Sequence, residues 1–322
     1  MKMSNIRDVA KLSRHSVSTV SHVINNRGYV SKDTRADILE AMKQLDYHPN
    51  DVARALSTGK TNTVGVVLPY IDIPYFQKLV SAITKVAFKE EYQVTLLPSD
   101  YDAKSEIKYL EMLKHHAFDG LIFTSRAISF EKILEYEQYG PITCCENTFD
   151  YPITCAYTDR ETSFVDVFKV LKVLNFDHIG VTTSRNEQDS PSTKLTKTAY
   201  KKVFGQKIDS QHLFVDAQDY SDGIDAVKYL VKEDPQLKVI FTNSDQVAAG
   251  VLRQLETMKL NIPVIGQENL DYSHLLDFST IDHKLTEIGE YAFWSIFEKE
   301  IVKKMIPSEF ILRGTLKKLH EQ

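Results

Sequence analysis

Beyond residue 62, the chain alternates between short runs rich in β-branched and apolar residues and longer stretches with apolar positions at helical spacing. Strands that are apolar almost throughout and alternate with helices predict parallel sheets covered by helices on both faces. The number of runs favours two sheets, and therefore two doubly wound α/β subdomains. Strands are expected at residues 63–69, 93–98, 120–124, 142–145, 155–158, 178–183, 213–216, 239–243 and 264–266. The clearest helices are expected at residues 75–89, 104–115, 163–174, 222–231 and 245–258.

The first 62 residues differ in charge from the rest of the chain. They contain ten Lys and Arg and six Asp and Glu, a net charge of +4. The whole chain carries −5, so residues 63–322 carry −9. A basic segment joined to an acidic one is typical of a polyanion-binding module attached to a regulatory domain. Chance variation over so short a segment is the alternative explanation.

Length and composition predict a globular cytoplasmic protein. The 322 residues suffice for two or three compact units. No apolar run approaches the roughly 20 residues that span a bilayer, and residues 1–5 lack the apolar core of a secretion signal. The three cysteines, Cys144, Cys145 and Cys155, fit reduced thiols better than a disulfide framework, because they are odd in number and two are adjacent.

Residues 6–25 show the pattern of two short helices joined by a tight turn. Each has a narrow apolar stripe, and Ser16 can cap the second helix. The outer face of that helix offers small and polar side chains, which suit the major groove of DNA. These exposed positions are Val17, Ser18, Thr19, Ser21 and His22.

A third helix is expected to begin near Ser31, with an apolar stripe formed by Ile38, Leu39, Met42 and Leu45. Three short helices on one small core predict an all-α helix-turn-helix domain over residues 1–49. Residues 50–62 follow as a hinge, where Asn50 can cap a short helix that would fold only with a partner. Leu56 could then wedge between base steps in the minor groove. A plain linker helix is the alternative.

Motifs that would indicate an enzyme are absent from the sequence. Only 12 glycines occur, about half the usual share of roughly 7%, and there is no GxGxxG, GxxxxGK[ST] or GxSxG. The adjacent His115 and His116 cannot share a helix face, so a solvated pair is expected there rather than a metal site. We expect no catalytic residues, no cofactor and no metal. The alternative is a sugar-binding or sugar-modifying protein without a DNA function.

The spaced motifs of residues 6–56 resemble those of the LacI/GalR family of bacterial repressors. They include D-V-A, T-V-S, V-[IL]-N, V-S-x-x-T-R, L-x-Y-x-P-N and A-R-x-L in one order. The resemblance implies a homodimer that binds a near-palindromic DNA operator, with base contacts from Val17, Ser18 and His22. It implies minor-groove contacts from Ala53 and Leu56. Backbone contacts are implied for Ser16, Thr19, Ser21, Asn25, Thr34 and Tyr47.

Two places in this segment depart from the family's pattern. His22 stands where Arg is usual, and it offers guanine one hydrogen bond at a time instead of two, so we expect altered or relaxed base preference there. Arg14 and His15 replace the usual Gly-Val of the turn. A residue with a side chain at positive φ costs on the order of 1 kcal/mol, which a phosphate contact of Arg14 could offset. A solvated turn residue is the alternative.

For the body, the resemblance implies a periplasmic-binding-protein-like fold with a small effector in the cleft between its subdomains. Subdomain 1 is expected at about residues 63–158 and 285–306, and subdomain 2 at about 159–284 and 307–322. Ligands of doubly wound sheets bind outside the carboxyl ends of the strands. That rule selects residues 70–76, 125–126, 159–160, 243–245 and 267–268.

Matching the family's motifs onto these places gives the candidate effector-binding residues. Glu268 stands where the family has Asp, and Thr196 stands where it has Arg, with Lys194 and Lys197 as substitutes. These departures put a standard free-sugar site in doubt. The candidate residues are Tyr75, Phe76, Ser125, Arg126, Asp159, Lys194, Thr196, Asp245 and Glu268.

Three interpretations of the cleft remain open. It binds a different metabolite, for example a phosphorylated one held by Lys194 or Arg126. Alternatively it is empty and a protein partner regulates the head; resemblance to the catabolite control proteins of the family implies serine-phosphorylated HPr. Finally, Arg126, Asp159 and Asp245 pair with one another as a structural network.

Overall fold

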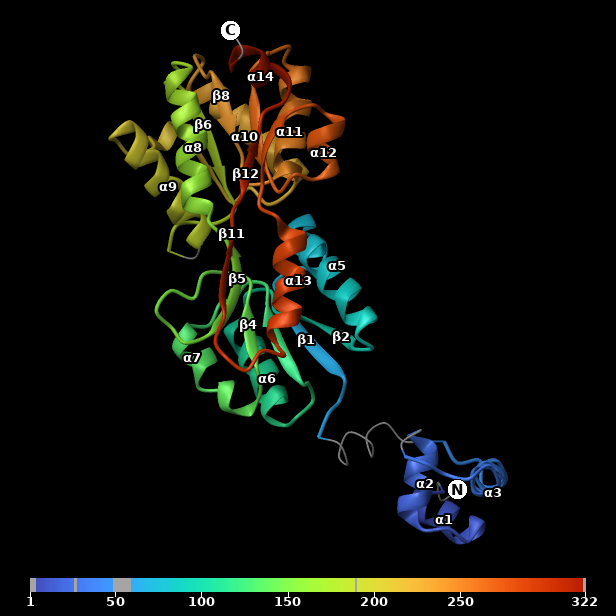
Figure 1. Cartoon of the computed structure of the whole chain (residues 1–322). Helices are drawn as coiled ribbons and strands as arrows, with labels where there is room; N and C mark the ends of the chain where they lie inside the picture. Colours follow the sequence, from blue (N-terminus) through green and yellow to red (C-terminus); the bar gives the residue numbers. More distant parts are fainter. Residues whose placement is uncertain (1–3, 26–27, 49–58, 189, 321–322) are drawn as a thin grey trace. The chain divides into compact units, whose positions relative to one another are not determined.

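The computed structural model describes residues 4–25, 28–48, 59–188 and 190–320, and the chain divides into two compact units (Figure 1). We call the first unit, residues 1–61, the head, and the second, residues 62–322, the body. Each unit has its own hydrophobic core, since the head's buried cluster is separate from the four of the body. The head and the body can therefore be considered as separate folding units.

Three short helices close on one small core in the described part of the head. They are α1 (Ile6–Ser13), α2 (Val17–Ile24) and α3 (Lys32–Gln44). Each begins at a polar residue, Asn5, Ser16 or Ser31, whose side chain accepts a backbone N–H of the first turn. Such caps contribute about 1 kcal/mol each. The expected helix-turn-helix head is confirmed, and its buried apolar residues are Val9, Ala10, Val20, Val23, Ile38 and Ala41.

The head also shows where the expectations need correction. Leu39 is 51% exposed, because Ala41 rather than Leu39 completes the buried stripe that Ile38 begins on α3. Arg14 has a φ of 58°, the left-handed conformation expected of a turn position where glycine is usual. The hinge positions Asn50, Ala53 and Leu56 lie outside the described residues, so no structure is assigned to them.

The first lobe of the body is a six-stranded parallel sheet, sheet A, in the order β11-β5-β4-β3-β1-β2 (Figure 1). Its strands are β1 (Thr63–Leu68), β2 (Gln93–Pro98), β3 (Gly120–Phe123), β4 (Ile142–Cys144), β5 (Thr154–Thr158) and β11 (Lys303–Ile306). Its helices are α5 (Pro74–Lys89), α6 (Ala103–Lys114), α7 (Phe130–Leu134), η1 (Glu137–Tyr139) and α13 (Leu285–Ser295).

The second lobe is built on sheet B, in the order β12-β10-β9-β8-β6-β7, in which only β12 is antiparallel to its neighbour. Its strands are β6 (Ile179–Thr183), β7 (Leu213–Val215), β8 (Val239–Phe241), β9 (Val264–Gln267), β10 (Ser279–Asp282) and β12 (Glu309–Ile311). Its helices are α8 (Arg160–Val173), α9 (Pro191–Phe204), η2 (Ser210–His212), α10 (Tyr220–Glu233), α11 (Asp245–Thr257), α12 (Asp271–Leu275) and α14 (Gly314–His320).

Apolar strands buried on both faces explain this architecture, and they confirm the expected α/β class. In sheet A, the core on one face includes Leu79 of α5 and Phe293 of α13, and the core on the other includes Leu110 of α6. In sheet B, Phe164 of α8 and Val251 of α11 belong to the two corresponding clusters. A sheet covered on both faces exposes only its edges, so ligands reach the strand ends from the loops.

Two glycines allow α10 and α11 to approach very closely. A Cβ on Gly250 would lie 1.9 Å from the carbonyl oxygen of Tyr220, and one on Gly223 would lie 2.2 Å from that of Val247. Neither position can hold a side chain without moving a helix backbone. This contact fixes the position of α11, whose N-terminal end carries Ser244 and Gln246 at the ligand cavity.

The structure differs from the expected elements at several places, since strands β10, β11 and β12 were not expected and helix α8 begins earlier. Strand β10 was not expected, because its buried side chains include Ser279 and Thr280, so the segment lacks an apolar run. Helix α8 begins three residues earlier than expected, at Arg160, because the Asp159 carboxylate accepts the backbone N–H of Thr162 at 3.1 Å and caps the helix there.

The chain passes between the two lobes three times: after β5, after β10 and after β11. Polar contacts tie these crossings together. The Lys284 ammonium lies 3.0 Å from Asp282 and 2.9 Å from Glu309, and the Ser308 hydroxyl donates to the carbonyl of Asp159 at 3.2 Å. The crossings are therefore one linked hinge region rather than three independent strands.

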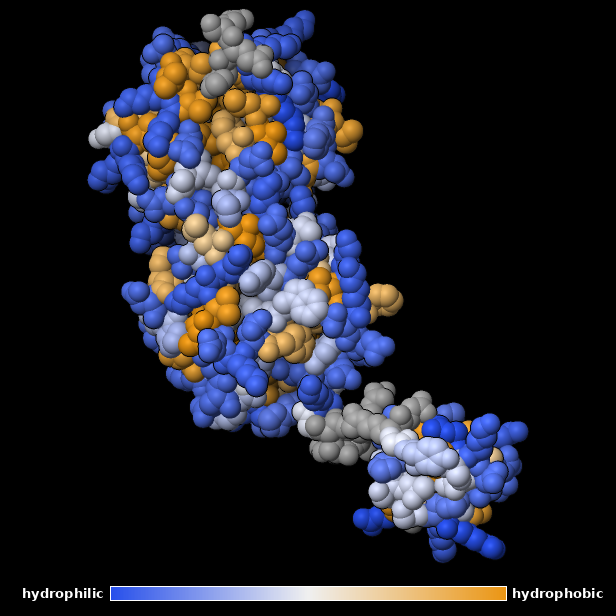
Figure 2. Space-filling model, in the orientation of Figure 1, coloured by the Kyte–Doolittle hydropathy of each residue, from blue (hydrophilic) through white to orange (hydrophobic). Residues whose placement is uncertain are grey.

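The visible surface of the body is mainly hydrophilic with separate hydrophobic patches (Figure 2). Among large apolar side chains, Phe88 is 83% exposed and Leu275 is 80% exposed, with Tyr272 and Leu276 beside Leu275 on α12 and its exit. Across the described ranges, every helix is too short or too polar to span a lipid bilayer.

Candidate nucleic-acid interface and ligand cavity

Helix α2 presents the side chains from which base contacts are expected. Val17 is 43% exposed, and Ser18 and His22 are also exposed, whereas Val20 and Val23 face the core. Residues 17, 18 and 22 therefore share the outer side of one short helix. A helix of this size with a polar outer face can enter the major groove of B-DNA, which is about 12 Å wide.

Most of the residues that are expected to contact the DNA backbone lie at or near the ends of helices. Ser16 accepts the N–H of Thr19 at 3.0 Å, and the Asn25 amide donates to the carbonyl of Ser21 at 2.9 Å. Thr34 stands in the first turn of α3, where its N–H donates to Ser31. Hydroxyl groups and helix N-termini are common phosphate contacts in protein–DNA complexes. Tyr47 packs against the head core, and burial raises the pKa of its hydroxyl.

The turn between α1 and α2 is anchored within the head. The N–H of Arg14 donates to Ala10, as the C-cap of α1. The His15 ring lies 3.3 Å from the carboxylate of Asp37 on α3. This contact gives His15 a structural role, while Arg14 stays exposed.

A cavity of about 270 Å³ lies between the two lobes of the body, at the carboxyl ends of their strands. Side chains from both lobes line it, so a ligand there would contact both sheets' loops at once. From the first lobe come Tyr70, Tyr75, Phe76, Tyr101, Ser125, Arg126, Cys145, Glu146, Phe149 and Tyr157. From the second come Arg160, Ser184, Arg185, Ser190, Ser192, Leu195, Gln218, Asn243, Ser244, Gln246 and Glu268.

The first-lobe wall is mostly aromatic. Tyr75 and Phe76 stand edge to face at 5.0 Å between ring centroids, as do Tyr70 and Tyr101 at 5.8 Å. Aromatic faces of this kind suit the apolar face of a sugar ring or a similar ligand. Among the described residues, Arg126 is the one cation of this wall. Its guanidinium pairs with Glu146 at 3.0 Å and lies 3.5 Å from the centroid of the Phe130 ring. The charge of Arg126 is therefore already compensated.

The second-lobe wall supplies two guanidinium groups. The Arg160 guanidinium lies 5.2 Å from the ring of Tyr75, and that of Arg185 lies 3.7 Å from the ring of Tyr101. Each arginine therefore reaches across the cavity to a first-lobe aromatic ring. Neither has a carboxylate within ion-pair distance among the described residues. Such guanidinium groups can take carboxylate or phosphate oxygens in charge-assisted hydrogen bonds.

Glu268 places a strained, buried carboxyl group at the cavity. Its φ is 99°, which a residue with a side chain adopts at a cost of order 1–3 kcal/mol. The Lys78 ammonium of α5 donates to the carbonyls of Glu268 and Asn269 at 3.2 and 3.1 Å, which holds this loop against the first lobe. Burial, and then the charge of Asp245, raise the Glu268 pKa well above its usual range. A neutral Glu268 could donate a hydrogen bond to a ligand as well as accept one.

The structure brings five of the expected effector-binding residues to the cavity: Tyr75, Phe76, Ser125, Arg126 and Glu268. The other four, Asp159, Lys194, Thr196 and Asp245, are not among the residues that line it. Asp159 caps α8, and the Thr196 hydroxyl donates to the carbonyl of Ser192 inside α9. Asp245 is buried, and it accepts hydrogen bonds from the Thr280 hydroxyl at 2.6 Å and the Leu270 N–H at 2.7 Å. Lys194 lies on α9 and is not among the lining residues.

These contacts also bear on the third interpretation of the cleft, a structural network of Arg126, Asp159 and Asp245. Arg126 pairs with Glu146, whereas Asp159 and Asp245 have the local partners given above. The three side chains are therefore not joined to one another in the described part of the chain. Similarly Lys197, a suggested substitute for the family's arginine, pairs with Glu187 at 2.8 Å.

Sequence reasoning missed several cavity residues. Arg185, Glu146, Tyr101 and Gln218 each follow the end of a strand, namely β6, β4, β2 and β7. The carboxyl-end rule would have selected them if it had been applied to every expected strand instead of to those with family motifs. Arg185 brings to the cavity a guanidinium group, the kind of group that was sought on α9.

Two family models match the chain. "Bacterial regulatory proteins, lacI family" matches residues 5–50, and "Periplasmic binding proteins and sugar binding domain of LacI family" matches residues 61–287. The first range covers the described helices of the head, and the second covers most of the body and all of the strand ends around the cavity.

Similar proteins extend over nearly the whole chain. Catabolite control protein B of Bacillus subtilis (strain 168) is 41% identical over 308 residues, covering 96% of this chain and 99% of that protein. A ribose operon repressor of Halalkalibacterium halodurans is 29% identical and covers 98% of each. Among solved structures, the lac repressor dimer bound to operator and the anti-inducer ONPF superposes with a TM-score of 0.81 at 20% identity, covering 98% of this chain and 99% of that one.

Proposed function

Because the chain belongs to the LacI family of bacterial regulatory proteins and is a DNA-binding transcriptional regulator, not an enzyme, we propose that it represses genes for the use of carbon sources. The names of its relatives support this pathway: a catabolite control protein and a ribose operon repressor. Repression of bacterial genes takes place in the cytoplasm, where the operator lies.

The head binds DNA through α2, and the body joins two chains into a homodimer. Each α2 enters one major groove, with Val17, Ser18 and His22 at base edges, so the operator is near-palindromic. The exposed apolar side chains of α12 and its exit, Tyr272, Leu275 and Leu276, support a second chain on that side of the body. The lac repressor structure with a similar fold is itself a dimer on its operator.

The cavity binds a small effector that has both an apolar face and oxygen-rich groups. The observation that carries this proposal is the pair Arg160 and Arg185, which face first-lobe aromatic rings without a carboxylate partner among the described residues. A phosphorylated sugar fits this wall better than a free sugar, because its phosphate can take both guanidinium groups. Glu268 then bonds a hydroxyl group of the same ligand.

Effector binding changes operator affinity through the body. A ligand that contacts both lobes favours their closed arrangement. By linkage, it strengthens operator binding if DNA also favours the closed arrangement and weakens operator binding if DNA favours the open one. A protein partner is the second candidate for the control of operator affinity. The resemblance to the catabolite control proteins of the family implies that this partner is serine-phosphorylated HPr. The 41% identity to catabolite control protein B supports this second candidate.

Operator binding by the full-length protein tests the proposal. Fluorescence anisotropy at fixed salt measures affinity alone, with free sugars, with sugar phosphates and with serine-phosphorylated HPr. We expect sugar phosphates to shift affinity by roughly 5- to 150-fold, the usual range of allosteric coupling. A shift with phosphorylated HPr alone would assign control to the protein partner. No shift with any of them would refute control through the body.

A further inference from the structure

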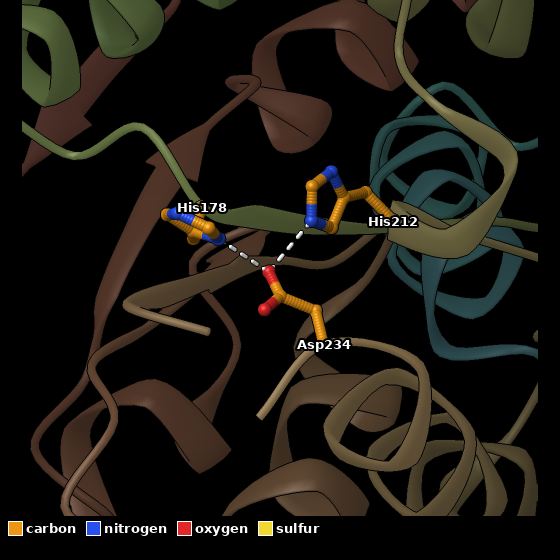
Figure 3. A group of neighbouring side chains, drawn as sticks. All are labelled: His178, His212 and Asp234. Atoms are coloured by element: carbon orange, nitrogen blue, oxygen red, sulfur yellow. Dashed lines mark hydrogen bonds and ion pairs between the residues drawn. The ribbon is translucent and has the colours of Figure 1, made fainter. Parts of the chain in front are cut away.

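Three side chains outside the ligand cavity meet at a single point in the second lobe (Figure 3). His178 Nδ1 lies 2.6 Å from Asp234 Oδ2, and His212 Nε2 lies 2.7 Å from the same oxygen. Each side chain offers one ligand atom, and these atoms all lie within 4.8 Å of one another. We call these three residues the histidine–aspartate cluster.

The cluster joins three connections at the amino end of sheet B. His178 directly precedes β6, His212 ends η2 just before β7, and Asp234 caps the end of α10. The ligand cavity lies at the opposite, carboxyl ends of these strands. The cluster is therefore a separate site, and its role differs from effector binding.

A nearly buried carboxylate faces two imidazole rings at this point. The side chain of Asp234 is only 7% exposed and that of His212 only 9%. Among the described residues, no Lys or Arg pairs with Asp234; the nearby Lys238 pairs with Asp177 at 2.6 Å. A buried carboxylate without a cation is costly, and neutral imidazoles do not remove its charge. A cation bound between the three side chains would.

Orientation and access also suit an ion. The second carboxylate oxygen of Asp234 accepts the N–H of Gln236 at 2.9 Å, which fixes the direction of the first. The side chain of His178 is 31% exposed, so its edge leaves room for an ion to enter and for a water molecule as a further ligand. Three protein ligands and one water are a common arrangement for zinc.

We infer that the histidine–aspartate cluster binds one divalent transition-metal ion of the zinc type through His178 Nδ1, His212 Nε2 and Asp234 Oδ2. Tetrahedral ligands at zinc stand about 3.3 Å apart, because each bond is about 2.0–2.2 Å long. The nitrogen–oxygen separations of 2.6 and 2.7 Å need to open by less than about 1 Å, which rotation of the partly exposed His178 provides. The ion cross-links three loops and stabilises the second lobe.

Metal binding to the untagged full-length protein, stripped with a chelator, tests this inference. Calorimetry with Zn²⁺ should give saturable binding of one ion per chain. Co²⁺ at the same site should show the visible absorption bands of tetrahedral coordination by nitrogen and oxygen. Zn²⁺ at about 100 times its Kd should raise the Tm by roughly 5 to 10 °C.

Glutamine variants separate a metal ligand from a hydrogen-bond partner. In His178→Gln and His212→Gln the side-chain amide can still donate to Asp234, but the imidazole ligand is gone. We expect each to weaken Zn²⁺ binding by more than about 100-fold, beyond the roughly 10- to 100-fold loss that removal of a supporting residue causes. His115→Gln, an exposed histidine of the first lobe, is the matched control and should bind as the wild type does.

The inference is overturned if the stripped wild-type protein shows no saturable Zn²⁺ binding. It is equally overturned if its Co²⁺ form has no tetrahedral bands, a result that does not depend on any variant folding. Equal Zn²⁺ affinity in the wild type and in a folded His178→Gln or His212→Gln variant would place the ion elsewhere and would leave the cluster a set of hydrogen bonds.

Discussion

The head and the body carry their function in different ways. The head's expected base contacts come from one short helix, within six consecutive positions from Val17 to His22. The body's cavity collects side chains from both lobes, between Tyr70 and Glu268 in sequence. Their cores differ as well, since one cluster of six buried side chains holds the head, whereas four larger clusters hold the body.

This difference shows which properties are local. A contiguous recognition surface survives as long as one helix forms and is capped, so it can be altered one side chain at a time. A cavity made by loops from two lobes depends on both sheets and on the hinge region that joins them. Substitutions on α2 should therefore change base preference directly. Substitutions in the cavity should change ligand binding directly and operator affinity only through the coupling between the two sites.

Removal of residues 1–62 should have the largest effect. The truncated protein loses α2, so operator affinity should fall by at least about 10³-fold, the usual gap between specific and non-specific binding. The body should stay folded and dimeric, since it is a separate compact unit. Gel-shift and sedimentation measurements on the two proteins check this. A truncated body that is monomeric would contradict the proposal that the body alone forms the dimer.

Loss of the two cavity arginines should have the next largest effect. Hydrogen bonds to charged groups contribute about 1.5–3 kcal/mol each, so Arg160→Ala with Arg185→Ala should weaken binding of a sugar phosphate by at least roughly 100-fold. Calorimetry measures this. Arg253→Ala, an exposed arginine of the same lobe that pairs with Glu256, is the control and should bind normally. Equal weakening of binding in the control variant would show that the two cavity arginines do not bind the sugar phosphate specifically.

The stability of the body should depend on Asp245 between pH 4 and 7. Burial raises the pKa of Asp245 from its ordinary value of 3.8 to about 7. The neutral form is favoured by folding, so this contribution is fully present below about pH 4 and is lost as pH rises through about 7. The difference is at most on the order of 4 kcal/mol.

Thermal melts of the wild type and of Asp245→Asn across this range isolate the effect. The Tm of the wild type should fall relative to that of the variant as pH rises from 5 to 7. Asp225→Asn, an exposed carboxylate on α10 beside Lys228, should follow the wild type as the matched control. Parallel curves for wild type and Asp245→Asn would show that Asp245 titrates normally.

His22→Arg should have a smaller and local effect. Arginine can contact guanine by two hydrogen bonds where histidine makes one, which corresponds to about 1–3 kcal/mol of discrimination. We expect preference at one base pair of each half-site to sharpen by roughly 10-fold. Binding to a set of single-base operator variants measures it, with Lys11→Arg on α1 as the control. Unchanged preference would mean that His22 does not contact a base.

Several features of the fold could be predicted from the sequence, because they depend on local spacing. The caps Ser16 and Ser31 and the apolar strand β1 follow from residue type and periodicity. Strand β10 could not be found that way, since its buried side chains Ser279 and Thr280 are polar and are satisfied only by tertiary partners.

The candidate site shows the same limit. Tyr75 and Phe76 could be located because they begin the helix that follows the first predicted strand and because they match a motif. Arg185 was missed, although it follows β6, because the family's arginine was sought on the next helix. Asp245 matches a family motif, yet its carboxylate is turned to Thr280 and Leu270, a choice that only packing decides.

Selection of bound duplexes from a random DNA pool by the full-length protein at low salt tests the central claim most directly. If two copies of α2 read one operator, the selected sequences will share a near-palindrome, and their affinity will fall steeply with salt because several phosphates are neutralised. A pool that stays random after several rounds, with sugar phosphates and serine-phosphorylated HPr also supplied, would contradict the account.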